Sequence, residues 1–265
     1  GAFPNTLWSV APYVAVSVFD PHSPVRLDYG IRGQINYEIA PSLSLDAAAS
    51  VRVSGNISDE EDDTNDSNIP HVRTSSREYD NRLQLEKLTA NWYSRPAENL
   101  FGRVTVGYLE TMYGGVSGEV LWKKPNSPFA LGAELNYAVQ RDFDDAFAFQ
   151  DYDIMTGHVS AYYAFDGGFH GKVDVGRYLA GDWGATLSVD REFNNGWRVG
   201  AYATLTDVPF EDFGEGSFDK GIRITVPSAW FAGTPTTETN DFVIQSLTRD
   251  GGAKLNVGGR LYDRV

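Results

Sequence analysis

Apolar and polar residues alternate along most of this chain, and residues 26–39 give the clearest example. Leu27, Tyr29, Ile31, Gly33, Ile35, Tyr37 and Ile39 form one set, and Arg26, Asp28, Gly30, Arg32, Gln34, Asn36 and Glu38 form the other. A period of two places the two sets on opposite faces of a β-strand. This predicted strand of 14 residues is much longer than the usual strand of roughly 5–6 residues.

The same pattern predicts strands throughout the sequence. They fall at residues 6–19, 26–39, 43–53, 82–94, 101–109, 114–122, 129–141, 155–165, 172–176, 185–190, 198–205 and 217–227. Between some of them lie Gly181-Asp182 and Asn194-Asn195-Gly196, which favour tight turns because Asn and Gly tolerate positive φ. We therefore expect about twelve strands, or fourteen if residues 242–247 and 255–262 are strands as well.

The connections between the predicted strands alternate between short and long. The short ones are residues 40–42, 96–99, 125–127, 166–168 and 194–196, and the long polar ones are 55–81, 142–154 and 209–216. Outer-membrane barrels have this asymmetry, with tight periplasmic turns and longer external loops. A sandwich with Greek-key crossovers does not predict such an alternation of short and long connections. The predicted fold is therefore all-β: a single transmembrane antiparallel up-and-down β-barrel over residues 1–265, with 55–81 as an acidic external loop.

The two faces of the predicted strands assign residues to lipid and to lumen. Residues expected to line the lumen and contact a transported chain are Arg26, Asp28, Arg32, Gln34, Asn36, Arg103, Glu134, Asn136, Lys172, Asp174, Asp190, Arg198, Tyr202 and Arg223. Aromatic residues near strand ends fit the girdles of a membrane barrel: Trp92, Tyr93, Trp122, Phe165, Trp183 and Trp197. A soluble sheet also has one polar face, and in that alternative the same aromatics belong to a core or to hairpins.

Composition excludes several classes of protein. The net charge of −14 argues against nucleic-acid binding by phosphate neutralisation, and the absence of cysteine excludes a disulfide scaffold and a Cys nucleophile. No stretch approaches the roughly 20 apolar residues of a membrane helix. The chain starts at Gly1 without a secretory signal, so we expect either a removed signal or a fragment of a longer protein.

Candidate chemistry is sparse in this sequence. His158 and Ser160 would share a strand face as base and nucleophile, with Glu134 completing a triad, but a polar lumen contains such residues by composition alone. The acidic run at residues 59–63 lacks the ligand spacing of an EF-hand, so a mobile, solvated loop is the simpler interpretation. Asp151 and Asp153 are interpreted as a loop pair. We expect neither a metal nor a cofactor.

The C-terminal region, residues 228–265, has no clear pattern of alternation. Residues 219–226 resemble the closing strand of an outer-membrane barrel, with a polar residue, a glycine and two spaced apolar residues. Residues 242–247 and 255–262 alternate only weakly. This C-terminal region is therefore expected to add strands or to lie inside or beneath the barrel as a plug.

Several motifs resemble one protein family. They are YLETMYGGVSGEVLW at 108–122, QRDFD at 140–144, DYD at 151–153 with TGH at 156–158, GRYLAGDWGAT at 176–186, FGEGSFDKG at 213–221 and LTRDGGA at 247–253. Together they resemble the C-terminal part of YjbH-type outer-membrane proteins from exopolysaccharide and group 4 capsule operons. The resemblance is distinctive over residues 100–265 and only general before residue 100. It implies a barrel cut from a longer protein, location in the Gram-negative outer membrane and a role in polysaccharide export.

Mixed charges on the lumen face suit a neutral or weakly charged solute, such as a carbohydrate chain. A lumen of about twelve strands is narrower than that of porins with 16–18 strands. The functional hypothesis is a non-enzymatic barrel for exopolysaccharide export, whose partners are membrane lipid, a polysaccharide chain, other domains of the longer protein and export-machinery proteins. The alternatives are a non-conducting scaffold that docks such machinery and, third, a hydrolase sited in the lumen.

Overall fold

A computed structural model describes residues 3–18, 25–56, 68–79, 81–209, 218–227, 239–245 and 250–265. These residues form one antiparallel sheet of thirteen strands, in which each strand pairs with its neighbours in sequence. The strands are β1 (Asn5–Val18), β2 (Val25–Ala40), β3 (Leu43–Gly55), β4 (Leu83–Ala97), β5 (Leu100–Tyr108), β6 (Tyr113–Lys123), β7 (Phe129–Arg141), β8 (Phe149–Ala164), β9 (Phe169–Arg177), β10 (Trp183–Glu192), β11 (Arg198–Thr206), β12 (Asp219–Pro227) and β13 (Thr239–Gln245). Three short 3₁₀ helices complete the described elements: η1 (Thr74–Tyr79), η2 (Asp166–Gly168) and η3 (Leu261–Asp263).

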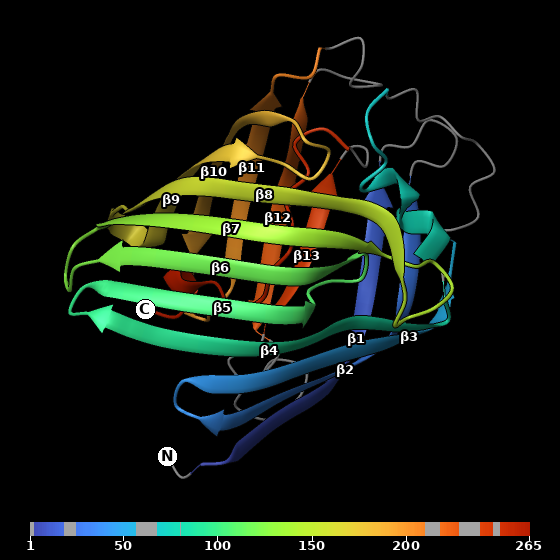
Figure 1. Ribbon diagram of the computed structural model, residues 1–265, viewed down its shortest axis with the longest axis horizontal. Helices are drawn as coiled ribbons and strands as arrows, with labels where there is room; N and C mark the ends of the chain where they lie inside the picture. The colour runs from blue at the N-terminus through green and yellow to red at the C-terminus, as the bar shows by residue number, and fades with distance from the viewer. Residues whose placement is uncertain are drawn as a thin grey trace.

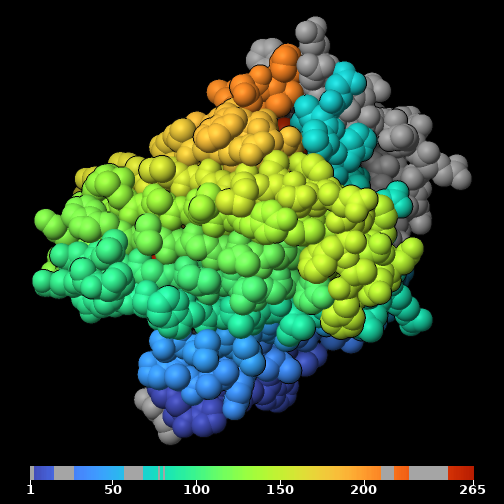
Figure 2. Space-filling view, viewed as in Figure 1, coloured from blue at the N-terminus to red at the C-terminus, as the bar shows by residue number. Residues whose placement is uncertain are grey.

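The sheet curls until its two edges meet, because β1 and β13 contact each other. Figure 1 shows β4 to β8 as the near wall, with β10 to β13 behind them. The space-filling view shows the near wall as a continuous surface from β4 to β8 (Figure 2). The predicted all-β, up-and-down architecture is confirmed, and the described strand number falls between the two numbers predicted from sequence.

Five short connections lie at one end of the sheet, and the opposite end has long as well as short ones, since the β5–β6 link is residues 109–112 and the β9–β10 link is residues 178–182. The end with the short connections, here called the turn end, includes the links β2–β3, β4–β5, β6–β7, β8–β9 and β10–β11. Three of these turns contain residues in the left-handed region: Asn126 with φ 61°, Gly167 and Gly168 with φ 77° and 79°, and Gly196 with φ 82°. Asn and Gly adopt this conformation at little cost. The opposite end, called the loop end, carries residues 68–79 and the links β5–β6, β7–β8 and β9–β10.

The apolar side chains of the strands face outward, and the polar ones face inward. Leu135, Val159 and Leu187 are 60%, 62% and 56% exposed, whereas Arg103 and Asn136 are each 1% exposed. Water-soluble proteins bury large apolar side chains and keep arginine at the surface. This sheet has the inverse arrangement, which is the one that lipid-exposed barrels require.

Exposed aromatic side chains border the outer apolar surface at both ends. Trp92, Trp122, Phe129, Phe165 and Phe193 lie near the turn end, and Tyr29, Tyr137, Phe149 and Trp183 lie near the loop end. Four of the six aromatics predicted for these girdles are among them. The prediction for Tyr93 is wrong, because its side chain points inward and its hydroxyl donates to the Gly259 carbonyl. Trp197 is only half-exposed and lies in a turn.

Two sequence predictions about the loop end are also wrong. Strand β8 begins at Phe149, so Asp151 and Asp153 lie within a strand and do not form a loop pair. The described part of the predicted loop at 55–81 is not a solvated segment, because Val72 is fully buried and Tyr79 is 5% exposed. The acidic run at residues 59–63 lies outside the described residues.

Candidate functional site: the barrel interior and its C-terminal tail

The C-terminal segment, residues 250–265, lies inside the barrel and is called the tail below. Its contacts begin with residues of the loop end, such as Val72, and finish at the turn end, where Tyr262 stacks on Tyr162 with ring centroids 4.1 Å apart. The C-terminus therefore lies at the turn end (Figure 1). Of the two predicted tail strands, residues 242–247 overlap β13, and residues 255–262 form part of this internal segment.

Two apolar clusters hold the ends of the tail. At the loop end, Leu255 and Val257 pack among Val72, Leu109 and Leu179. At the turn end, Leu261 packs among Leu121, Ala130 and Tyr162. The tail is thus anchored by buried apolar contacts on both sides of a polar middle section, each large aliphatic side chain contributing roughly 1.5–3 kcal/mol on full burial.

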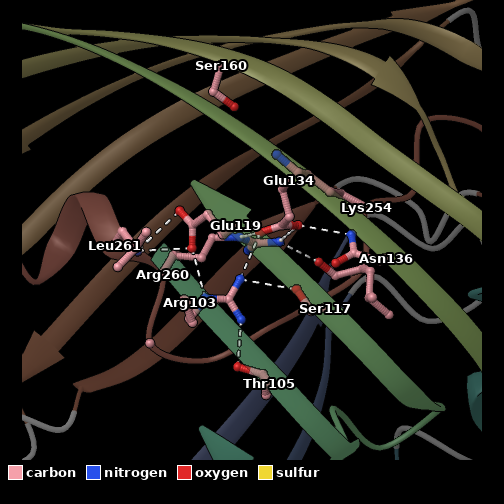
Figure 3. Close-up of polar contacts among 12 residues, drawn as sticks. Arg103, Thr105, Ser117, Glu119, Glu134, Asn136, Ser160, Lys254, Arg260 and Leu261 are labelled. Carbon is pink, nitrogen blue, oxygen red and sulfur yellow. Dashed lines mark hydrogen bonds and ion pairs between the residues drawn. The ribbon is translucent and has the colours of Figure 1, made fainter. Parts of the chain in front are cut away.

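Between the two apolar clusters, the barrel interior is polar and is centred on Arg103, whose side chain is fully buried. Its guanidinium donates to Glu119 at 2.8 Å and to Glu134 at 3.3 Å, and it also reaches Thr105 and Ser117 (Figure 3). A buried cation needs several partners to compensate for lost hydration. β5, β6 and β7 meet this need because their inward residues lie at the same level of the sheet, with Arg103 opposite Glu119 and Glu119 opposite Glu134.

The tail adds its own cations to this network. Arg260 forms a bidentate pair with Glu134, with N···O distances of 2.8 and 3.0 Å. Lys254 contacts the Asp174 carboxylate at 2.9 Å, and Lys172 contacts the same group at 3.0 Å. Figure 3 shows Arg260 and Lys254 close to Glu134. The tail therefore neutralises wall carboxylates.

A second group of contacts fastens the tail at the loop end. The Asp250 carboxylate accepts hydrogen bonds from the backbone nitrogens of Val72, Arg73 and Thr74 and from the Thr74 hydroxyl, at 2.8–3.0 Å. Arg73 binds Glu110 at 2.6 and 3.0 Å and also donates to the Lys254 carbonyl. Burial lowers the pKa of Arg73, but Glu110 and nearby anions more than reverse this effect, so the guanidinium stays charged.

Asp182, in the β9–β10 link, supplies a further loop-end contact. Its carboxylate accepts the Gly252 backbone N–H at 2.7 Å. Burial raises the pKa of this carboxyl group above its ordinary value. Asp182 thus holds Gly252 of the tail to the β9–β10 link, while Asp250 of the tail binds residues 72–74.

Replacing Asp250 with alanine is expected to lower the free energy of unfolding by about 3 kcal/mol, because it strands buried donors that bond to a charged acceptor. The expected local effect is faster tryptic cleavage at Arg73 in the reconstituted barrel. Asp263→Ala is the matched control, since the Asp263 side chain is 58% exposed and its loss should cost less than about 1 kcal/mol. Equal effects of the two substitutions would contradict the role assigned to Asp250.

The residues predicted to line the lumen occupy two parts of the interior. Glu134, Asp174, Arg198, Lys172, Arg103 and Asn136 belong to the network around the tail, Arg198 through Asp263 at 2.9 Å. Asp28, Arg32, Gln34, Asn36, Asp190, Tyr202 and Arg223 line the remaining wall, where Arg32 pairs with Glu86 at 2.8 Å and Asn36 donates to Asp46 at 2.5 Å. The side chain of Arg26 lies outside the described residues.

The geometry does not assemble the hydrolytic triad considered from sequence. His158 and Ser160 are both buried in the interior, but the Ser160 hydroxyl donates to Asp174. Among the described residues, neither ring nitrogen of His158 has a hydrogen-bond partner, and its ring packs edge-on against Tyr178. Glu134 serves Arg103 and Arg260 instead. A base that does not contact its nucleophile does not meet the geometric definition of a triad.

Within the described ranges, no three His, Asp or Glu side chains gather where they could hold a metal ion. The same residues contain no helix that is long and apolar enough to cross a membrane.

A family model described as "Exopolysaccharide biosynthesis protein YbjH" matches residues 2–265. The chain belongs to the YjbH family. The match extends the similarity seen in residues 100–265 over almost the whole sequence. A YjbH protein of Escherichia coli (strain K12), described as "Uncharacterized lipoprotein YjbH", is 37% identical over 263 residues. The match covers 96% of this chain and 38% of that relative, so the chain spans less than half of the relative's length.

The sequence of this YjbH-family chain did not predict the residues of the tail that contact the barrel wall. Lys254, Arg260 and Asp250 lie in a segment without a strand pattern, and Arg73 lies in a stretch interpreted as solvated loop. One signal was present: LTRDGGA at 247–253 is among the motifs that resemble the family, and it includes Asp250 and Gly252. A family motif in a patternless segment indicates specific contacts.

Proposed function

We propose that this chain forms an outer-membrane β-barrel that takes part in exopolysaccharide export. The observation that carries the proposal is the inverted sheet, apolar and aromatic-bordered outside and charged inside, in a chain of an exopolysaccharide biosynthesis family. The proposed partners are membrane lipid, the polysaccharide chain, other parts of the longer protein and proteins of the export machinery.

The height of the apolar surface supports the membrane assignment. On β7, the girdle residues Phe129 and Tyr137 are eight positions apart, or about 27 Å along the strand at ~3.4 Å per residue. Tilting of the strand by about 40° reduces the height to about 20 Å, close to the roughly 25 Å apolar band of membrane barrels. The turn end would then face the periplasm and the loop end the cell exterior.

Replacing Leu187 with arginine is expected to lower the free energy of unfolding in lipid vesicles by about 2–4 kcal/mol, because it places a charge on the lipid face. Leu187 lies near the middle of β10 and is 56% exposed. Urea titration followed by tryptophan fluorescence measures the loss. Asn194→Arg in the β10–β11 turn is the control, because Asn194 is exposed, and it should change stability by less than about 0.5 kcal/mol. A Leu187→Arg barrel as stable as the control would show that this face does not contact lipid.

The export role is tested in cells that lack the full-length YjbH-family protein. Complementation with that protein should restore polysaccharide in the medium. Cells without the protein should retain polysaccharide in the periplasm. Unchanged amounts in both compartments would overturn the proposal. Migration of the unheated barrel on gels provides the independent test of the fold, because a closed barrel in detergent resists unfolding until it is heated.

A second candidate, a non-conducting scaffold, is favoured by one observation. The tail runs through the interior and is held by apolar clusters and ion pairs. A conduit therefore requires the tail to move aside, whereas a scaffold does not. Single-channel recordings in planar bilayers distinguish the two: a barrel that supports export in cells but shows no openings, even without its tail, acts as a scaffold.

A further inference from the structure

The two edge strands of the sheet run in the same direction. Each strand is antiparallel to the one before it, so the first and the thirteenth, β1 and β13, both run from the turn end to the loop end. They contact each other, but no ladder of backbone hydrogen bonds joins them among the described strands. Their lengths also differ, because β1 has 14 residues and β13 has 7. The contact between β1 and β13, called the seam below, is therefore the unpaired junction of the described sheet.

An unpaired seam is costly in a membrane. Lipid offers no hydrogen bonds to the backbone N–H and C=O groups of an edge strand, so membrane barrels close without leaving edges. Bacterial outer-membrane barrels also have an even number of antiparallel strands. One further strand, running from the loop end to the turn end, would be antiparallel to both β1 and β13 and could pair with both. The seam thus has the geometry of a site for a fourteenth strand.

The tail already runs in the direction that such a strand needs. It begins at the loop end, where Asp250 binds the backbone of Val72, and it finishes at the turn end, where Tyr262 stacks on Tyr162. It follows β13 in the sequence, and the nine residues from 246 to 254 exceed the roughly two to five of a hairpin loop. The nine residues that come next, 255–263, have the length of a transmembrane strand, roughly 9–11 residues.

This stretch carries a short alternation, although the tail as a whole has no sustained period. Apolar side chains stand at Leu255, Val257 and Leu261, and polar ones at Asn256 and Arg260. A period of two puts the apolar set on one face of a strand and the polar set on the other. In the seam, the apolar set would face lipid and the polar set the lumen, which is the arrangement of the walls.

Each wall carboxylate that binds the tail also has a cation of the wall. Glu134 keeps Arg103 at 3.3 Å when Arg260 is absent. Asp174 likewise keeps Lys172 at 3.0 Å. Withdrawal of the tail therefore leaves neither carboxylate without a positive partner, which limits the electrostatic cost of the move.

The backbone of the tail is held in the interior by side chains and not by a sheet. Glu110 accepts the backbone N–H of Asn256 at 3.0 Å, and Glu119 accepts that of Leu261 at 3.1 Å. Pairing with β1 and β13 would replace these bonds with a ladder on each side. The backbone groups of the tail are thus satisfied in both positions, as membrane proteins require.

We propose that residues 255–263 leave the interior and pair between β1 and β13 as a fourteenth strand. The seam is the acceptor site, and its occupant is this segment of the same chain. The move joins the edges of the sheet by hydrogen bonds and clears the interior of the segment that fills it. The inference rests on the proposed function, because it describes how a conduit for polysaccharide opens.

Disulfide formation in membranes of cells that express the full-length protein tests the proposal. Val10→Cys or Val14→Cys, on the outward face of β1, is combined with Leu255→Cys, Val257→Cys or Leu261→Cys. Residues that share a face on neighbouring strands come close enough for a disulfide. At least one combination should therefore link on oxidation and separate with reductant. Mass spectrometry of the tryptic peptides identifies the link.

Asn256→Cys, combined with the same substitutions in β1, is the matched control. Asn256 is exposed in the interior, whereas Val257 is 7% exposed. A tail that merely moved about would react at position 256 at least as readily as at 257. In a strand at the seam, position 256 faces the lumen and should give no link to the outward cysteines. The single variant Val10→Cys shows whether the β1 strands of two copies pair instead.

No link from any of the three apolar positions would overturn the inference, as would equal linking from Asn256→Cys. Links between two copies of Val10→Cys would also overturn it, because the seam would then bind a second copy of the chain. Export is measured in parallel for the wild-type protein in cells. Export without any link would overturn this inference alone, whereas the expected link without export would overturn the proposed function alone.

Discussion

Replacing Glu134 with glutamine is expected to lower the free energy of unfolding by about 3 kcal/mol, because the change breaks a buried ion-pair network. The substitution keeps the shape of the side chain and removes its charge. Arg260 then loses both short contacts to a carboxylate, and the fully buried Arg103 keeps only Glu119 as an anionic partner. Removing one member of a buried ion pair leaves the other charge uncompensated, which is why a conservative change has a large effect.

Urea unfolding in lipid vesicles, followed by tryptophan fluorescence, measures this effect. Glu98→Gln provides the matched control: the chemical change is the same, but Glu98 is exposed in the β4–β5 turn, so the expected change is below about 0.5 kcal/mol. Thermal shift of the two variants in detergent gives an independent comparison. If Glu134→Gln and Glu98→Gln unfold at the same urea concentration, the Arg103 network does not stabilise the barrel.

A disulfide between positions 179 and 253 is expected to abolish polysaccharide export if the barrel conducts. The Leu179 backbone N–H donates to the Ala253 carbonyl at 2.9 Å, which places the two backbones in direct contact, the proximity that a disulfide needs. The chain contains no other cysteine, so Leu179→Cys with Ala253→Cys forms a single defined bond. Oxidation then locks the tail to the β9–β10 link.

Secreted polysaccharide is compared in oxidised and reduced cells that carry the double variant. Export should fall to the level of cells without the protein on oxidation and recover with reductant. Each single-cysteine variant controls for the lost Leu179 side chain and for the redox treatment. Full export by the oxidised double variant would show that the tail stays in place during export, and the scaffold function would then be the better account.

The alternation of residues predicted most of the sheet because each strand separates two very different surroundings. On β7, each apolar residue from Leu131 to Tyr137 faces outward and each polar one faces inward, and the strand bounds match those expected from sequence. The rule failed on β8, where Asp151 and Asp153 lie on a strand above the apolar band. Acidic residues near a strand end are hard to distinguish from a polar loop, because both contact water.

The candidate site was only half predictable for a different reason. Its wall residues follow the strand period, which places Glu134 and Asp174 on the inward face of the sheet. The tail has no such period, because it lies among side chains on several sides and pairs with no strand in the described ladders. Its partners are set by three-dimensional proximity, and a single sequence gives no periodic signal for contacts of that kind.

The route of the tail also sets an order of events during folding. Hairpins such as β6–β7 join neighbours in sequence, whereas Asp250 meets Val72 across 178 positions and Arg260 meets Glu134 across 126. Contacts between distant positions form slowly, since a long loop must close before they gain any energy. The receiving surface combines residues from β4 to β11, so it does not exist until those strands have paired. Tail insertion therefore follows the pairing of those strands, and until it occurs Glu134 and Asp174 lack the cations that Arg260 and Lys254 supply.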